Sequence, residues 1–323
     1  MKVLWPHNFS PDSPFAGKPM RILVAGMRDL GIDVHLEYLG ILRNPLDLSK
    51  ARRTVRNLSA EYDLVHSQFG SACALACVSA RSPKVLSLRG SDWHIYKGRH
   101  LGLRLHNELA AWMSRISLKH YDKVIVMSNR MAKEVSRFSP TSSVHVIPDA
   151  VDDIFFERRD RKASRALLGY PSDETPWVLF TTVSIDNPIK RASLALDAIN
   201  HLRRKGQKVE LRVASGIMPV DMPVFVSSCD VVLCTSTHEG WPNSVKEALA
   251  CGLPFVSTDI SDMKMISEKY PACRVVSPDS LSIADAIMDI IQNKSKVNLR
   301  ESVELMSIEK TCHRLKILYE SIK

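Results

Sequence analysis

The chain has no apolar stretch long enough to cross a lipid bilayer. Its longest run of small apolar residues, ACALACV at 72–78, is far shorter than the roughly 20 residues of a membrane-spanning helix. The N-terminal run MKVLW ends at Pro6, so it predicts a first strand and not a secretory signal peptide. These two absences favour a cytoplasmic protein.

Paired cysteines and metal-ligand spacings are also missing. The seven cysteines are scattered, odd in number and include no CxxC pair, as is typical of buried apolar cysteines in a reducing cytosol. No His/Cys spacing suits zinc, and the acidic cluster DAVDD at 149–153 falls in a predicted linker. We therefore expect no metal and no resident cofactor.

The middle of the chain has little net charge. Lys and Arg exceed Asp and Glu by seven in residues 1–155, fall one short in 156–309, and exceed them by three in 310–323. The formal net charge of +9 therefore belongs to the first half and the C-terminal tail. This distribution indicates either an anionic partner for that half or plain solubility. Aromatic residues do not alternate with the cations, so we expect no nucleic-acid partner.

Short apolar runs alternate with helical patterns along all 323 residues. We predict strands at KVLW, DVHLEYL, DLVHS, KVLSLR, KVIVMS and VHVIP, and again at WVLFTTV, VELRVAS, DVVLCTS, PFVSTD and CRVVS. Such alternation predicts parallel sheets covered by helices, here in two α/β Rossmann-like lobes. We expect the first lobe to comprise 1–155 plus a returning helix at 310–323, and the second 156–309.

The stretch STHEGWPNSVKEALACGLPFVSTD, at 236–259, places two carboxylates on either side of a helix start. Asn243 is expected at the N-cap of the helix, Pro242 blocks an earlier start, and Gly252 supplies the turn that ends it. Glu239 then lies in the loop after a strand, and Glu247 about one turn inside the helix.

The start of that helix is a predicted anion site. The backbone N–H groups of Ser244, Val245 and Lys246 are expected to point toward the loop, where the helix dipole favours negative charge. Ligands of open α/β sheets collect at the C-terminal ends of the strands, where this loop lies. A diphosphate on the amides and hydroxyls on the two acids would together describe a nucleotide sugar.

The segment EGWPNSVKEALACGLPFVSTD resembles the E-x7-E region of retaining GT-B glycosyltransferases of family 4. Other stretches resemble that family in the same order, over nearly the whole chain. They are LSLRGSDWH, YDKVIVMSNRMAKEV, VHVIPDAVDDIFF, VLFTTVSIDNPIKRASLALDAI and YESIK. The resemblance implies the GT-B fold, with two Rossmann-like lobes facing across a cleft, and activity without a catalytic metal.

The resemblance also implies roles for single residues. Glu247 would bind the ribose hydroxyls, Glu239 the transferred sugar, and Lys190 the diphosphate leaving group, unless Lys190 is a solvated lysine at a helix start. The sugar and diphosphate would also contact the loop and its amides, contributed by Gly240, Trp241, Pro242, Asn243, Ser244 and Val245.

Two positions depart from the family pattern. Ser184 stands where the family commonly has an arginine, so Arg191 compensates or the lysine acts alone. Arg89 replaces the histidine of the family's HGSD segment, and since arginine cannot accept a hydrogen bond, we expect it to contact a diphosphate or an anionic acceptor. Asp92 keeps its place and either accepts from an acceptor hydroxyl or caps the next helix.

Three further residues have both a functional and a structural interpretation. Gly17 would bring backbone close to the donor phosphate, or is a turn residue in a Pro/Ser-rich loop. Gly216 occupies the place of the family's GxG loop, a weak signal by itself. His66 would contact the acceptor, although the structural interpretation, a satisfied strand end, is favoured.

Two basic helices are predicted in the first lobe. Their apolar stripes, expected to face the core, are Leu48, Ala51, Val55 and Leu58 in one, and Leu101, Leu105, Leu109, Trp112 and Ile116 in the other. The cations would then face outward and could dock on the anionic inner face of the cytoplasmic membrane. They are Lys50, Arg52, Arg53 and Arg56 in the first helix, and Arg99, Arg104, Arg115 and Lys119 in the second.

The sequence therefore predicts a retaining, metal-independent hexosyltransferase. It would move a hexose or N-acetylhexosamine from a nucleotide-diphosphate sugar, with UDP favoured over GDP, to a glycan or lipid-linked acceptor. Bacterial surface polysaccharide, lipopolysaccharide or glycoconjugate synthesis is the expected setting. The alternative is a non-catalytic or epimerase-type GT-B protein that binds nucleotide sugars.

Overall fold

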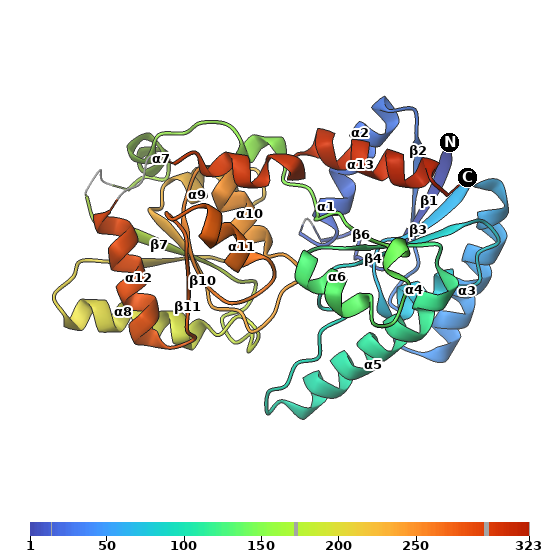
Figure 1. Cartoon of the computed structure of the whole chain (residues 1–323), viewed down its shortest axis with the longest axis horizontal. Coiled ribbons are helices and arrows are strands. Elements are labelled where there is room, and N and C mark those ends of the chain that lie inside the picture. The colour runs from blue at the N-terminus through green and yellow to red at the C-terminus, as the bar shows by residue number, and fades with distance from the viewer. Residues whose placement is uncertain (14, 171–173, 294–296, 323) are drawn as a thin grey trace. The chain divides into compact units, whose positions relative to one another are not determined.

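The computed structural model of the chain describes residues 1–13, 15–170, 174–293 and 297–322 (Figure 1). The backbone divides into two compact units. Unit 1 comprises Met1–Ala150 and Ile308–Lys323, and unit 2 comprises Val151–Ser307. The boundaries thus fall at 150 and 307, where the sequence predicted 155 and 309.

Unit 1 is built on a six-stranded parallel sheet in the order β2-β1-β3-β4-β5-β6. The strands are β1 (Lys2–His7), β2 (Asp33–Tyr38), β3 (Leu64–Ser67), β4 (Lys84–Leu88), β5 (Lys123–Val126) and β6 (Val144–Val146). The α-helices are α1 (Lys18–Arg21), α2 (Leu23–Asp29), α3 (Pro45–Leu58), α4 (Ser71–Cys77), α5 (Leu101–Ser117), α6 (Asn129–Val135) and α13 (Ile308–Glu320). Short 3-10 turns follow at η1 (Ser59–Glu61), η2 (Leu118–His120) and η3 (Thr141–Ser143).

Unit 2 repeats the plan with a five-stranded parallel sheet in the order β11-β10-β9-β7-β8. The strands are β7 (Trp177–Thr181), β8 (Glu210–Ala214), β9 (Val231–Cys234), β10 (Phe255–Thr258) and β11 (Arg274–Val276). The helices are α7 (Arg161–Leu167), α8 (Ala192–Arg204), α9 (Met222–Ser227), α10 (Asn243–Ala250), α11 (Met263–Lys269) and α12 (Ser280–Gln292), with 3-10 segments η4 (Asp153–Phe155) and η5 (Leu299–Met306). All eleven predicted strands are confirmed.

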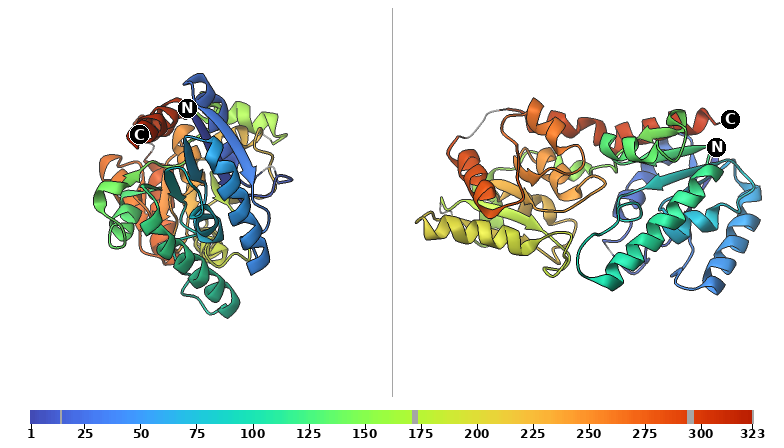
Figure 2. Two further views of the ribbon diagram at one scale, coloured as in Figure 1. Left: turned by 90° about the vertical axis from the view of Figure 1, so that its right-hand side faces the viewer. Right: turned by 60° about the horizontal axis from the view of Figure 1, so that its bottom comes forward.

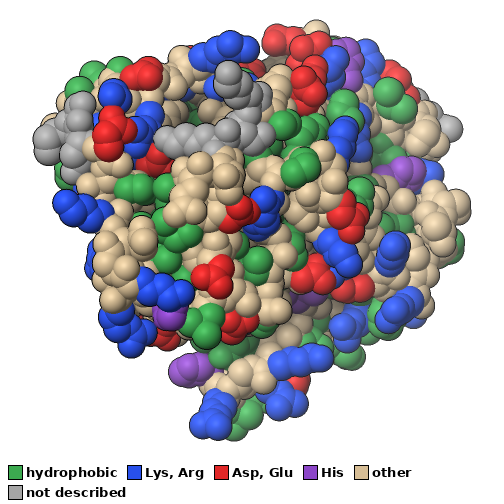
Figure 3. All heavy atoms as spheres, turned by 60° about the vertical axis from the view of Figure 1, so that its left-hand side comes forward, with side chains coloured by type: hydrophobic (Ala, Val, Ile, Leu, Met, Phe, Trp, Pro, Cys, Tyr) green, Lys and Arg blue, Asp and Glu red, His purple; other side chains and the backbone are tan. Residues whose placement is uncertain are grey.

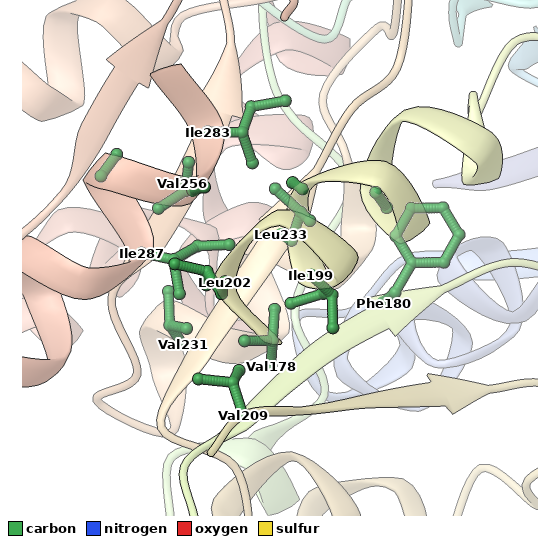
Figure 4. Packing of buried hydrophobic residues seen from close by; sticks show 14 of the residues in the cluster. Val178, Phe180, Ile199, Leu202, Val209, Val231, Leu233, Val256, Ile283 and Ile287 are labelled. Carbon is green, nitrogen blue, oxygen red and sulfur yellow. The ribbon is translucent and has the colours of Figure 1, made fainter. Parts of the chain in front are cut away.

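The core of unit 2 lies between its sheet and the pair of helices α8 and α12. Val178 of β7 and Leu233 of β9 pack against Ile199 of α8 and Ile287 of α12 (Figure 4). Because strands of a parallel sheet are covered on both faces, they read as continuous apolar runs, which is why the sequence located them. This packing holds the C-terminal ends of β7 and β9 side by side.

The last helix returns to unit 1, as the sequence predicted. α13 packs against α2 (Figure 1), and its Tyr319 hydroxyl accepts a hydrogen bond from Trp5 Nε1 of β1 at 3.1 Å. The Arg314 guanidinium donates to the Val146 carbonyl at the end of β6, and Lys316 Nζ to the Leu30 carbonyl. The C-terminal segment is therefore part of the first Rossmann-like unit.

The two basic helices of unit 1 turn out differently. In α3 the stripe faces inward as predicted, with Ala51 and Val55 buried and its cations exposed. In α5 the prediction was wrong, because Leu101, Leu105, Leu109 and Trp112 are exposed. α5 instead buries its small polar and alanine side, made of Asn107, Ala110, Ala111, Ser114 and Ser117.

Charged and apolar side chains are mixed on the surface in Figure 3, where neither sign of charge covers the whole face. Within the described ranges, no helix combines the length and the hydropathy that crossing a membrane requires.

Candidate functional site

Two loops of unit 2 meet at the C-terminal edge of its sheet. β7 and β9 are hydrogen-bonded neighbours, so the segment that leads from β7 to α8 lies beside the segment that leads from β9 to α10. The Thr237 amide donates to the Ile189 carbonyl at 2.9 Å, and Thr235 Oγ1 donates to the Lys190 carbonyl at 2.6 Å. The residues predicted from the two motifs are therefore brought together.

Lys190 and Glu239 form an ion pair at this edge. The Lys190 Nζ atom lies 2.7 Å from Glu239 Oε1, and Ser236 Oγ donates to the same oxygen at 2.9 Å. Burial would lower the pKa of the Lys190 ammonium, but the neighbouring Glu239 carboxylate outweighs it and raises that pKa above its ordinary value. The Lys190 side chain is 25% exposed and the Glu239 side chain 21%, so a ligand can reach the pair.

The helix that follows Glu239 begins at Asn243, with Pro242 at its N-cap and no side-chain cap. The prediction of Asn243 as the N-cap was therefore one residue late. The amides of Val245 and Lys246 both donate to the Pro242 carbonyl, at 3.1 and 3.2 Å. Of the three amides expected to face the loop, only that of Ser244 thus has no acceptor among the described residues.

Most of the other residues of the predicted donor loop are buried or hydrogen-bonded within unit 2. The Trp241 ring, Pro242 and Val245 are buried, while Asn243 is exposed. Ser261 Oγ donates to the Gly240 carbonyl at 2.7 Å and ties this loop to the one after β10. Glu247 is half-buried in the first turns of α10, on the same helix that Glu239 precedes.

Arg191 braces the ends of two strands. Its backbone is left-handed, with φ 52° and ψ 54°, directly before α8. Its guanidinium donates to the carbonyls of Thr235 and Ser236, at 2.5 and 3.0 Å, and to Thr258 Oγ1 at 3.3 Å. Burial lowers the pKa of Arg191. A left-handed non-glycine residue carries strain that surrounding contacts must hold in place, and these hydrogen bonds do so.

A cavity of about 610 Å³ opens beside Arg191, at the C-terminal ends of β9, β10 and β11. Most of the residues that line this cavity were not predicted from the sequence, among them Thr258, Asp259, Lys264 and Glu268. The positions of the strand runs PFVSTD and CRVVS could have indicated them, because both strands also end at this edge of the sheet.

Ser184 and Gly216 lie in exposed turns of unit 2. Ser184 follows β7, where its carbonyl accepts from Thr182 Oγ1 and from the Asn187 amide. Gly216 follows β8 in a left-handed conformation, with φ 71°. Each stands at the C-terminal edge of the sheet, where the sequence placed it.

Arg89 of unit 1 is held by two neighbours. Its guanidinium forms an ion pair with Asp149, and it donates to the carbonyl and side-chain oxygen of Gln68, at 2.8 and 3.1 Å. The predicted contact of Arg89 with an anion would therefore compete with Asp149.

Asp92 is fully buried in unit 1. Its carboxylate accepts from the amides of Gly70, Arg89 and Gly90, at 2.7 to 3.2 Å. Burial raises the pKa of Asp92, and these amide hydrogen bonds oppose the rise. Because no part of the residue is exposed, contact with an acceptor hydroxyl is not favoured. The prediction that Asp92 caps the next helix was wrong, since α5 has His100 at its N-cap and no side-chain cap. Asp92 instead holds the 89–90 turn and the Gly70 amide.

His66 and Gly17 take structural positions. The His66 ring is buried, with Nδ1 2.5 Å from the Tyr319 hydroxyl and Nε2 2.8 Å from Ser87 Oγ. Burial, aided by the Arg89 charge, lowers the pKa of His66 to about 3. Both ring nitrogens have partners, which favours the interpretation of His66 as a satisfied strand end. Gly17 has φ 70°, and an added Cβ would lie 2.9 Å from the Phe9 ring.

Both units match known families. Residues 9–154 match Glycosyltransferase Family 4, and residues 175–293 match Glycosyl transferases group 1. The chain is a GT-B protein of this glycosyltransferase type.

Two curated relatives of this type are similar in sequence. One is named as a teichuronic acid biosynthesis glycosyltransferase, TuaC of Bacillus subtilis, 23% identical over 260 residues. The other is the 2-deoxystreptamine N-acetyl-D-glucosaminyltransferase of Streptomyces fradiae, 23% identical over 245 residues. The matches cover 74% and 67% of this chain but only 64% and 58% of the relatives, so the chain spans about three fifths of their length.

Solved GT-B structures share the fold over 99% of the chain. Sucrose-phosphate synthase of Thermosynechococcus elongatus superposes with a TM-score of 0.78 at 17% identity, covering 98% of that chain. HepE of Anabaena, in complex with UDP, gives 0.71 at 17% identity over its full length. The UDP-GlcNAc 2-epimerase of Methanocaldococcus jannaschii gives 0.62 at 10% identity, also over its full length. The fold alone therefore does not separate glycosyl transfer from epimerisation.

Proposed function

We propose that the protein is a retaining glycosyltransferase that uses a nucleotide-diphosphate sugar, with UDP as the nucleotide. The observation that carries the proposal is the Lys190–Glu239 pair at the start of α10, at the C-terminal edge of the unit 2 sheet. A cation and a hydroxyl-binding acid then lie together where open α/β sheets bind their ligands. The UDP complex of HepE and the names of the two curated relatives support the same class of donor and reaction.

The proposed reaction moves a hexose or N-acetylhexosamine to a glycan or lipid-linked acceptor. The bond between the anomeric carbon and the diphosphate oxygen breaks, and the acceptor oxygen bonds to that carbon on the same face. The acceptor proton passes to the departing diphosphate, so no enzyme nucleophile or metal is required. The name of the TuaC relative, which refers to teichuronic acid biosynthesis, supports a setting in bacterial surface polysaccharide synthesis.

The residues of unit 2 have distinct tasks in this reaction. Lys190 would bind the diphosphate and stabilise its growing negative charge, which is usually the largest single contribution to such catalysis. Glu239 would accept hydrogen bonds from hydroxyls of the transferred sugar, and Glu247 from the ribose. Arg191 would position the loop after β9 by holding its carbonyls, which would leave Lys190 as the phosphate-binding cation.

A donor panel tests the proposal. UDP and GDP sugars are screened by thermal shift, and then by nucleotide release with and without a glycan or lipid-linked acceptor. We expect stabilisation by UDP sugars and a new glycoside that forms only with the acceptor. Release of an epimer or a free sugar without acceptor would instead establish the epimerase-type alternative, which the fold of the 2-epimerase also allows. Binding without any turnover would make the protein a non-catalytic nucleotide-sugar binder.

A further inference from the structure

One helix of unit 1 carries its apolar stripe on the outside. Leu101, Leu105, Leu109 and Trp112 of α5 are 66%, 56%, 54% and 55% exposed. Their spacing of four, four and three residues places them in one line along the helix. We call these four residues the α5 stripe. Figures 1 and 2 show α5 at the surface of unit 1, next to α4.

The opposite side of α5 already has its partner. Ser114 Oγ accepts from the Ser71 amide at 2.7 Å and donates to the Asp92 carbonyl at 2.6 Å. At Gly70, just before α4, an added Cβ would lie 2.5 Å from Ser114 Oγ, so the two helices approach closely. At about 100° per residue, this buried side lies about 180° from the α5 stripe. Packing within unit 1 is thus complete without the stripe.

The charge around the α5 stripe is mostly positive. Residues 97–119 contain five Lys or Arg and a single carboxylate, Glu108. Glu108 is paired with Arg104 at 2.8 Å, so these two charges cancel and the other four cations have no carboxylate within residues 97–119. Lys97 and Arg99, just before the helix, and Lys119, just after it, are exposed.

We propose that α5 docks on an anionic lipid surface, with the α5 stripe inserted at the boundary of head groups and acyl chains. An amphipathic helix with Leu and Trp on one side and cations around it binds membranes by apolar burial together with attraction to anionic lipid. A second copy of this chain is the less suitable occupant, because it would bring five further cations against the same side. An anionic leaflet complements both the apolar stripe and its charge.

Docking would also locate the loop that precedes α5. Because Ser114 holds the Asp92 carbonyl and Asp92 holds the amides of Arg89 and Gly90, this turn moves with α5. Bound to a leaflet, α5 would hold the 89–92 turn on the side of the helix that faces away from the lipid, about one helix diameter (about 10 Å) from the stripe. The docking itself needs neither donor nor acceptor, so it can be measured without assuming the proposed reaction.

Tryptophan fluorescence gives a direct readout of the α5 stripe. The chain has five tryptophans, all within the described residues, and Trp112 is the only one of them that is exposed, since Trp5, Trp93, Trp177 and Trp241 are buried. Insertion of Trp112 would shift its emission to the blue and expose it to quenching by brominated lipids. The wild-type protein is mixed with vesicles of phosphatidylglycerol and phosphatidylcholine, or of phosphatidylcholine alone, and binding is measured by co-flotation.

Three variants separate the contributions. L105S/L109S removes two exposed leucines and is expected to weaken binding to anionic vesicles by at least about tenfold, since both lose apolar burial. The matched control L167S/L281S changes two exposed leucines of α7 and α12 and should bind as the wild type does. K97Q/R99Q should weaken binding to anionic vesicles and make it less sensitive to salt.

Three outcomes would overturn the proposal. The first is vesicle binding that L105S/L109S leaves unchanged, and the second is wild-type binding that is no stronger to anionic than to neutral vesicles. The third is an absence of vesicle binding. In that case, a concentration-dependent dimer in light scattering that L105S/L109S abolishes would assign the α5 stripe to a second copy. None of these outcomes depends on donor turnover, so the proposed function is tested separately.

Discussion

Lys190 Nζ lies 2.7 Å from Glu239 Oε1, although 49 residues separate the two in the chain. The pKa of Lys190 lies above its ordinary value of 10.5, so the ammonium is charged throughout the neutral range. An arriving diphosphate would therefore meet a fixed cation whose counter-ion is the acid assigned to the sugar.

Replacing Glu239 with Gln tests this relationship. The amide can still accept from Ser236 but carries no charge for Lys190, so the lysine loses its counter-ion while the loop keeps its hydrogen bond. We expect UDP-sugar turnover to fall at least about a hundredfold, with unfolding temperature nearly unchanged. Initial rates and thermal unfolding of the two proteins check this. Normal turnover would show that Glu239 has no part in the reaction.

Glu247 should behave differently, because it is assigned to the ribose and not to the reacting sugar. We expect Glu247→Ala to raise the Kd for UDP by about tenfold, the loss of one or two hydrogen bonds to a charged group. At saturating donor, kcat should stay close to that of the wild type. Calorimetric titration with UDP measures the change in Kd, and initial rates at saturating donor measure kcat. An unchanged Kd would remove the assignment.

His66 makes the stability of unit 1 depend on pH. Its pKa is lowered to about 3 in the folded chain from an ordinary 6.5, so the folded ring is neutral where the unfolded ring is charged. The unfolded state then binds the extra proton, and the stabilisation present above about pH 6.5 is lost toward pH 3, at about 1.4 kcal/mol per pH unit.

The comparison variant is His66→Gln, which keeps hydrogen-bonding groups near Tyr319 and Ser87 but cannot titrate. The opening free energy of β3 and α13, obtained from hydrogen-exchange protection factors that are corrected for the intrinsic pH dependence of exchange, should fall more steeply in the wild type between about pH 7 and pH 4.5. The raised pKa of Asp92 acts in the opposite direction in both proteins and largely cancels in the comparison. Equal pH dependence in the two would contradict a neutral, buried His66.

Two glycines test the close approach of α4 and α5. Gly70→Ala would place a Cβ 2.5 Å from Ser114 Oγ and 2.8 Å from Asp92 Oδ2, so we expect a loss of about 1–3 kcal/mol of unfolding free energy. Gly102→Ala, at an open position within α5, should stabilise by up to about 1 kcal/mol. Urea unfolding measures both changes. If both variants changed the unfolding free energy equally, the residues around Gly70 would have to move aside for the added Cβ at little cost.

The sheets were predictable because parallel strands are buried on both faces and read as continuous apolar runs. Each of the eleven runs became a strand, from KVLW to CRVVS. The position of the site was predictable, because the loops after β7 and β9 leave the same edge of the sheet. The first residue of α10 was not predicted correctly. Pro242, and not Asn243, is the N-cap, and its carbonyl accepts from the amides of Val245 and Lys246.

Side-chain partners at a distance lay beyond the sequence. Nothing in the local pattern indicates that Arg89 meets Asp149 or that Asp92 holds the Gly70 amide, because these residues come from segments far apart in the chain. The brace that Arg191 forms across β9 and β10 is of the same kind.

The sequence by itself determined the alternation of strands and helices, the two-unit plan and the family, since each follows from local burial patterns and short motifs. Only the tertiary structure decided which side of α5 is buried. There, close contact between Gly70 and Ser114 selects the helix side with small residues, and the leucine stripe is left facing outward. An amphipathic pattern gives the division of a helix into two sides, but the shape of the neighbouring surface decides which one is packed.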